Sequence, residues 1–216
     1  MKKRIWLMIF MSVGLWSQAQ TADWKFGVNF ASGLSWSNAS MDVAPDGAGG
    51  MFDISIVAEK YFRERYAFYA GLSYMNSKAQ IKNNSAGNIS LKTENLAFDV
   101  QKSANYRLQY LTVPVGMKFV TQQFRLFSYY FQAGLLPGVK IGGSVALDDG
   151  VRHSFSKDLN LMTCGVQLSS GCLYPIMSEN FVKGGLIFNY FFTDALNASN
   201  MKAFPLSAGI VLGYVF

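Results

Sequence analysis

Hydrophobic and polar side chains alternate along much of this chain with a period of two residues. Phe26 and Phe30 fall on one face of the segment 24–36. Lys25 and Asn29 fall on the opposite face. This period is typical of a β-strand with two unlike faces, whereas an amphipathic helix would repeat every 3.6 residues. The alternation therefore predicts a chain built from strands.

The alternating segments are separated in turn by short and by long connections. Short periplasmic turns and longer extracellular loops are the usual arrangement in outer-membrane barrels. The pattern predicts an all-β fold, an eight-stranded antiparallel up-and-down transmembrane β-barrel. Its strands are expected at 24–36, 51–62, 66–77, 106–120, 124–140, 158–173, 181–193 and 203–216. Its outward loops are expected at 37–50, 78–105, 141–157 and 194–202.

The alternation alone does not tell which face meets lipid, since a soluble barrel has the same period with its apolar face inward. Aromatic side chains gather near the strand ends, where the interfacial girdles of a membrane barrel lie. The opposite face carries Gly, Ser, Thr, Asn and Gln, which suits a crowded polar interior. We therefore predict that the apolar face points outward to lipid. The aromatic residues near strand ends are Trp24, Tyr66, Tyr74, Tyr190 and Tyr214.

The N-terminus has the composition of a secretory signal. Positive charges at 2–4 precede an apolar run at 5–15, and small or polar residues follow up to Ala19. The run is shorter than the roughly 20 apolar residues that a membrane-spanning helix needs. We expect residues 1–19 to be a signal peptide and residues 20–216 to form one barrel domain. Export and a membrane barrel together predict the outer membrane of a Gram-negative bacterium, with its lipid as a partner.

The predicted interior carries charge. An eight-stranded barrel is just wide enough for side chains to fill it, and unpaired charges inside a protein are costly. The charged residues are therefore expected to form an ion-paired, hydrogen-bonded plug. The alternative is a narrow channel for small solutes or ions. The residues on the predicted inner face are Lys25, Asp53, Glu59, Lys118 and Lys183.

Three segments have a more specific sequence. Residues 110–119 read Tyr-Leu-Thr-Val-Pro-Val-Gly-Met-Lys-Phe, residues 131–138 read Phe-Gln-Ala-Gly-Leu-Leu-Pro-Gly, and residues 212–216 read Leu-Gly-Tyr-Val-Phe. Together they resemble the PorT-like outer-membrane β-barrel family, one of the small porin-superfamily groups. The resemblance implies a small outer-membrane barrel. Because the founding member of that family is tied to protein secretion, it also favours a structural or secretion-associated envelope component.

The resemblance gives meaning to residues in two of these segments. Tyr214 and Phe216 form the kind of aromatic C-terminal ending that outer-membrane assembly machinery reads as a signal. The simpler interpretation is a last strand that faces lipid. Pro114 lies within a predicted strand although proline has no N–H for the ladder. We expect a bulge or bend there, and a docking site for a partner is the alternative.

The connection at 78–105 is longer than a compact barrel needs, and loops of this length are usually functional or disordered. Its apolar centre, Leu96, Ala97 and Phe98, lies among several lysines. We expect this segment to contact other envelope or secretion proteins or surface glycans. The alternative is a hairpin that extends two strands beyond the membrane.

The remaining residues give little support for catalysis. His153 is the only histidine and Ser154 follows it, which keeps a lipid-modifying enzyme as a less favoured alternative. Consecutive strand residues point to opposite sides, a poor geometry for a base and its nucleophile. The run at 148–150 lacks the ligand periodicity of a calcium loop, and no zinc spacing or dinucleotide fingerprint is present. We predict a protein that is not an enzyme and has no cofactor or metal.

Charge and cysteine content add two further expectations. The formal net charge is +6, and three of these charges lie at 2–4 in the predicted signal. The remaining excess does not indicate nucleic-acid binding. Cys164 and Cys172 on one strand would be roughly 26 Å apart, too far for a disulfide. If they instead lay across a turn, a disulfide would be feasible in an oxidising compartment.

Overall fold

The computed structural model describes the chain from Trp24 onward, with gaps, so the predicted signal peptide lies outside the described residues. Among the described residues no helix is long and apolar enough to cross a membrane. The described ranges are 24–41, 43–83, 89–90, 97–98, 103–146, 152–154, 161–176, 180–194 and 201–216.

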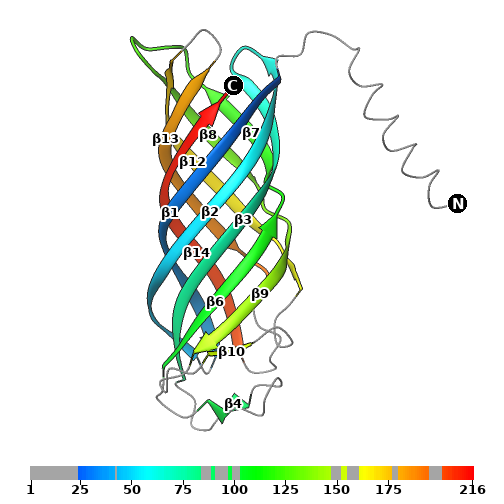
Figure 1. Cartoon of the computed structure of the whole chain (residues 1–216), viewed down its shortest axis with the longest axis vertical. Coiled ribbons are helices and arrows are strands. Elements are labelled where there is room, and N and C mark those ends of the chain that lie inside the picture. Colours follow the sequence, from blue (N-terminus) through cyan, green and yellow to red (C-terminus); the bar gives the residue numbers. More distant parts are fainter. Residues whose placement is uncertain are drawn as a thin grey trace, which may run out of the picture.

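Eight strands hydrogen-bond in a closed ring, each antiparallel to both of its neighbours (Figure 1). In ring order they are β1 (Trp24–Met41), β2 (Val43–Arg63), β3 (Tyr66–Asn83), β7 (Val115–Val120), β8 (Ser128–Leu135), β12 (Gly165–Pro175), β13 (Phe181–Phe191) and β14 (Met201–Val215). The ring closes through the pairing of β14 with β1 and of β3 with β7. A closed ring has no open sheet edge, which is the condition for a sheet to lie in lipid.

Two ring strands continue beyond a break at a proline. β6 (Ser103–Thr112) precedes β7 and pairs with β3, and Pro114 lies between β6 and β7. β9 (Gly138–Ala146) follows β8 after Pro137 and pairs with β6. The Gly71 N–H donates to the Pro114 carbonyl at 3.0 Å, so the wall stays bonded at the break. The irregularity expected at Pro114 is thus an interruption of the ladder.

The remaining strands are short. β10 (Arg152–Ser154) and β11 (Met162–Thr163) both pair with β9. β4 (Ile89–Ser90) pairs with β5 (Ala97–Phe98) in a separate two-stranded sheet. β11 lies immediately before β12 and continues the sixth predicted strand, so the wall has the eight strands that the sequence predicted.

The strands tilt strongly relative to the barrel axis. Following the paired residues once around the ring from Lys25 returns to β1 at Ser35, ten residues further along. For eight strands this stagger corresponds to a tilt of about 40° and to an interior that side chains can fill. Because of the tilt, residues far apart in sequence lie at one level of the interior.

The two ends of the barrel differ. At the end that we call the turn end, a tight turn joins β2 to β3, and the start of β1 lies beside the C-terminus, at the top of Figure 1. At the other end, the loop end, the strands run further than the sequence predicted. β1 reaches Met41 and β2 begins at Val43, so the predicted loop at 37–50 is wrong. This stretch is rich in Gly and Ser, but pairing with β14 and β3, helped by irregular register near Pro45, overrides local propensity.

The other predicted loops are shortened in the same way. β3 extends to Asn83 and β6 begins at Ser103, which agrees with the hairpin alternative for 78–105. β9 extends to Ala146 and β14 begins at Met201. Strand pairing therefore continues beyond the stretches where hydrophobic alternation is visible.

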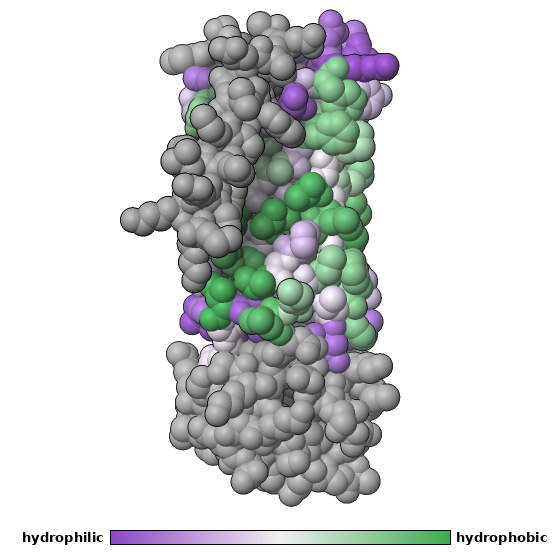
Figure 2. Space-filling view, turned by 90° about the vertical axis from the view of Figure 1, so that its right-hand side faces the viewer, coloured by the Kyte–Doolittle hydropathy of each residue, from purple (hydrophilic) through white to green (hydrophobic). Residues whose placement is uncertain are grey.

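The outer face of the wall is apolar, as predicted. Large side chains such as Ile56, Leu186 and Ile210 are each more than 60% exposed. Figure 2 shows hydrophobic residues along the described wall between more hydrophilic ends. Polar residues such as Asn189 and Ser207 are buried in the interior. The predicted eight-stranded antiparallel barrel is confirmed.

Candidate functional site

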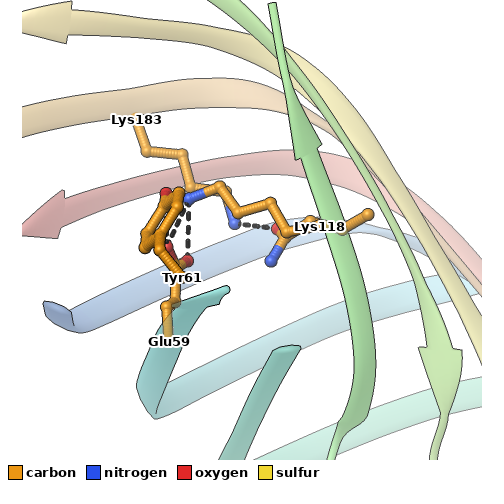
Figure 3. A network of polar contacts seen from close by, with 5 residues as sticks. Glu59, Tyr61, Lys118 and Lys183 are labelled. Carbon is orange, nitrogen blue, oxygen red and sulfur yellow. Dashed lines mark hydrogen bonds and ion pairs between the residues drawn. The ribbon is translucent and has the colours of Figure 1, made fainter. Parts of the chain in front are cut away.

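A buried ion pair lies in the interior near the turn end. The ammonium of Lys118 on β7 is 2.8 Å from Glu59 Oε1 and 2.7 Å from Glu59 Oε2 (Figure 3). The Tyr61 hydroxyl donates to the same Oε2 at 3.1 Å. Both charged side chains are almost completely buried. Charge-assisted hydrogen bonds of this kind stabilise a buried pair only when the geometry is good, and here both carboxylate oxygens have donors.

The sheet register explains why this pair forms. Ala67 on β3 pairs with Tyr61 on one side and with Lys118 on the other. Ala67 is fully buried and has a small side chain, so it leaves space above β3. The long side chain of Lys118 crosses that space to reach Glu59 on β2.

Lys183 on β13 joins the same level of the interior from the opposite wall. It donates a hydrogen bond to Gln132 Oε1, and its ammonium lies 4.7 Å from the ring centroid of Tyr130. The Lys118 ammonium lies 5.8 Å from the same ring. An aromatic face attracts cations, so Tyr130 offsets part of the repulsion between the two lysines. We call Glu59, Lys118, Gln132, Tyr130 and Lys183 the charged layer.

Glycines make room for the aromatic ring in the charged layer. A Cβ atom on Gly185 would collide with the Tyr130 hydroxyl and with the backbone carbonyl of Ser170. The Tyr130 hydroxyl instead makes a hydrogen bond with Ser169 Oγ at 3.2 Å. A second glycine has the same role, because a Cβ atom on Gly134 would collide with the Tyr69 hydroxyl.

Asp53 lies further toward the loop end. It is six residues from Glu59 along β2, about 15 Å along the barrel axis for a strand tilted by about 40°, and it accepts a hydrogen bond from Ser73 Oγ. A cavity of about 20 Å³, room for about one water molecule, separates it from Lys183.

The interior charges are paired less completely than the sequence suggested. The structure places all five predicted residues on the inner side of the wall, and Glu59 and Lys118 form an ion pair. Within the described part of the chain, Asp53 and Lys183 bond to neutral groups and Lys25 lies over aromatic rings. The interior thus combines one ion pair with hydrogen bonds and cation–π contacts, because the tilt places Lys183 beside another lysine and Asp53 at a different level.

In the half of the interior toward the loop end, large apolar side chains lie among smaller polar ones such as Asn189 and Ser207. The rings of Tyr110 on β6 and Phe191 on β13 stack with centroids 5.3 Å apart and an interplanar angle of 13°. The other large members are Met51, Met75 and Leu108, all fully buried. We call these five residues the aromatic layer.

The sequence prediction missed most of the aromatic layer. It placed Tyr110 on the inner face but expected a polar interior throughout. The available signal was that Met75 and Phe191 occupy inner-face positions of otherwise polar alternation. Lys140 was missed too: it is buried with its ammonium 5.8 Å from the Tyr110 ring centroid.

Lys25 lies at the turn end and is half-buried. Its ammonium is 4.4 Å from the Phe181 ring centroid and 5.4 Å from that of Tyr61. It lines a cavity of about 280 Å³ that opens at this end of the barrel.

The C-terminal residues are bonded to the first strand. The backbone N–H and carbonyl of Phe216 both bond to Phe26 at 2.8 Å, and the two rings lie 6.4 Å apart. Tyr214 and Phe216 are both on the outer face. Their role as an assembly signal stays a prediction, since this geometry is also that of a last lipid-facing strand.

The other candidates from the sequence are not gathered into a site. His153 and Ser154 are consecutive residues of β10, paired with Val145 and Ser144 of β9. Asp148, Asp149 and the centre of the segment 78–105, apart from β4 and β5, lie outside the described residues. Cys164 and Cys172 are free cysteines that form no disulfide, and Cys172 lies within β12.

Comparison with known proteins gives a family and a set of similar folds. A family model described as "Outer membrane protein beta-barrel domain" matches residues 17–199. No curated protein matches the chain.

Among solved structures, neisserial surface protein A is 16% identical, with 87% of this chain and 96% of that chain covered and a TM-score of 0.44. The outer membrane protein OprG from Pseudomonas aeruginosa is 12% identical, with 88% and 95% covered and a TM-score of 0.43. The outer membrane protease OmpT from Escherichia coli is 7% identical, with 93% and 100% covered and a TM-score of 0.45.

Proposed function

The chain belongs to the outer membrane protein β-barrel domain family and lies in the outer membrane, and from this premise we propose that it is a closed barrel with a structural or secretion-associated role. In this proposal the protein is neither a pore nor an enzyme. The resemblance to the PorT-like family supports the secretion-associated form of the role. The turn end would face the periplasm and the loop end the exterior, as is usual in such barrels.

The filled interior carries the proposal. The charged layer occupies the half near the turn end, and the stacked rings of Tyr110 and Phe191 occupy the half near the loop end. The cavity between the layers, beside Asp53, measures about 20 Å³. A hydrated ion needs more space than one water molecule, so this cavity is too small to hold one.

The lengths of the strands support a role outside the membrane. β1, β2 and β3 contain 18, 21 and 18 residues. A transmembrane strand needs about 9–11 residues to cross the bilayer. These strands are therefore long enough to continue well past the membrane, and β4 and β5 lie within the predicted partner-binding segment 78–105 that follows β3. Such an extension suits contact with another envelope or secretion protein.

A narrow channel is the second candidate function. The observation in its favour is that the cavity at the turn end and the small cavity beside Asp53 lie on the two sides of the charged layer. Movement of Lys118 and Lys183 would connect them, but the aromatic layer would still have to open.

Conductance separates the two functions. The purified protein in planar lipid bilayers is expected to give no discrete current steps. The variant Y110A/F191A/E59A/K118A, which removes the stacked rings and also the ion pair that closes the charged layer, is expected to conduct, and Tyr129→Ala on the outer face serves as the control that stays silent. Regular current steps from the wild type would contradict the closed-barrel proposal.

A second experiment tests the secretion-associated role. Cross-linking in cells, followed by purification, should recover envelope proteins with the full chain. Recovery should fall when residues 84–102 are replaced by a short Gly-Ser linker that leaves β3 and β6 intact. An equal recovery from that variant would contradict a partner at this segment.

A further inference from the structure

A cavity at the turn end has the construction of a ligand site. Its volume of about 280 Å³ is at the small end of the range for binding pockets. The β2–β3 turn supplies Glu64 and Arg65, and the starts of β1 and β13 supply Lys25 and Phe181. Lys118 of the charged layer lies at its inner side. The cavity therefore opens to the turn end and is closed on the inside by the Glu59–Lys118 pair.

The charges that line the cavity are not balanced. Lys118 is engaged with Glu59, both of whose oxygens already have donors. The two remaining cations are Lys25 and Arg65, and the remaining carboxylate is that of Glu64, which is exposed at the rim. Within the described part of the chain, neither Lys25 nor Arg65 forms an ion pair. Among the side chains that line the cavity, the two cations Lys25 and Arg65 outnumber the one remaining carboxylate, that of Glu64, so the lining has an excess positive charge.

Two aromatic rings hold the Lys25 ammonium in place without neutralising its charge. Its ammonium lies over the rings of Phe181 and Tyr61, at 4.4 and 5.4 Å from their centroids. Contacts with ring faces hold a cation while leaving its N–H groups available to a hydrogen-bond acceptor. Lys25 is half-buried, so an anion beside it would be partly shielded from solvent and salt.

Neutral polar groups complete the lining. Thr121, Gln122, Gln123 and Ser128 surround the cavity on the side of β7 and β8. The Thr121 hydroxyl already donates to the Gln122 carbonyl at 3.0 Å, and the Gln123 amide donates to the Arg125 carbonyl at 3.2 Å. The Ser128 hydroxyl and the Gln122 amide are of types that can donate to an oxygen atom of a ligand. Arg65 adds a planar guanidinium, whose fork matches the two oxygens of a carboxylate or phosphate.

We propose that this cavity binds a single oxyanion group, a carboxylate or a phosphate, carried by a small ligand that enters from the turn end. Lys25 and Arg65 are the binding residues. Phe181 and Tyr61 are positioning residues that hold the Lys25 ammonium. In the orientation proposed above, the ligand would come from the periplasm.

The test uses the full mature chain in lipid vesicles and isothermal titration calorimetry. Three probes distinguish the sources of the oxyanion: acetyl-dialanine, its C-terminal amide, and inorganic phosphate. Binding of either anion is expected, and the amide is expected not to bind. Heat from acetyl-dialanine alone assigns a carboxylate ligand, and heat from phosphate alone assigns a phosphate ligand. No binding of either anion, or equal binding of the amide, overturns the proposal.

Charge-removing variants locate the site. Lys25→Gln and Arg65→Gln should each weaken anion binding about tenfold, the effect of losing one hydrogen bond to a charged group. The matched control is Lys60→Gln, because Lys60 lies at the same rim but on the outer face, 5.5 Å from the Trp24 ring. Lys25→Arg keeps the charge and should keep binding. Equal weakening by Lys60→Gln would mean that the anion responds only to the general charge of the rim, and would overturn the assignment.

The folded state of each variant is checked independently. A closed barrel migrates faster on a denaturing gel before boiling than after, so this shift shows whether a variant is folded. If Lys25→Gln is folded and still binds the anion as the wild type does, the role given to Lys25 is wrong. Anion binding is measured without conductance and without partner capture. A failure of the anion-binding proposal is therefore distinguishable from a failure of the proposed function.

Discussion

The charged layer and the aromatic layer lie inside the same barrel wall but are held together by opposite means. In the charged layer, Glu59 and Lys118 are buried as ions and each depends on the other. In the aromatic layer, Tyr110 and Phe191 fill space by stacking on each other, and the charged group beside them, the Lys140 ammonium, lies 5.8 Å from the Tyr110 ring centroid. The first depends on exact partners, whereas the second depends on volume.

The difference follows the surroundings of each layer. The charged layer lies directly beneath the cavity of about 280 Å³ at the turn end. Charged groups can be tolerated there because polar side chains and solvent lie on one side of them. The aromatic layer lies deeper toward the loop end and closes the interior by close packing. A barrel wall of constant architecture can therefore combine a polar entrance with an apolar seal.

Removing one member of the ion pair should have the largest effect. Glu59→Gln leaves the buried Lys118 ammonium without its counter-charge, and we expect a loss of about 3–5 kcal/mol in the free energy of unfolding. Unfolding by guanidinium in lipid vesicles measures it. The double variant E59Q/K118M removes both charges and should recover most of the loss. A loss in the double variant as large as in the single one would show that volume, and not charge, holds this layer.

Removing a ring from the aromatic layer should lower the free energy of unfolding somewhat less. Phe191→Ala is expected to lower the free energy of unfolding by about 3 kcal/mol, because it removes apolar contacts and leaves a cavity but no unpaired charge. Since an apolar cavity binds small apolar molecules, benzene should restore part of this stability. Benzene should not restore the stability of the Glu59→Gln variant. Equal restoration of the two variants would contradict the distinction between the layers.

The sequence predicted the wall of the barrel better than its contents. Alternation identified the strands because every other residue of a transmembrane strand meets lipid, as at Phe26 and Phe30. Alternation could not show where strands continue beyond the membrane. The stretch 37–50 has no apolar face, and it forms strands because it pairs with β14 and β3.

The interior was predicted as a set of residues but not as a network. The five charged positions follow from the inner face alone, but their partners depend on the stagger of the ring. Ala67 lies opposite both Tyr61 and Lys118, and so leaves Lys118 a path to Glu59, only because β7 pairs with β3 at that register. A single sequence does not show this register, because β3 and β7 are separated by a long connection.

The smallest expected effect comes from two hydroxyl groups, one in each layer. The Tyr110 hydroxyl is buried and has no hydrogen-bond partner among the described residues, whereas the Tyr130 hydroxyl bonds to Ser169. Tyr110→Phe should therefore leave stability unchanged or raise it by up to about 1 kcal/mol, because a buried unpaired polar group is unfavourable. Tyr130→Phe should lower stability by about 1 kcal/mol, since it removes a hydrogen bond and leaves its partner unsatisfied. The same guanidinium titration measures both variants. Opposite signs would support the division into a layer held by polar partners and a layer held by packing, and equal losses would contradict it.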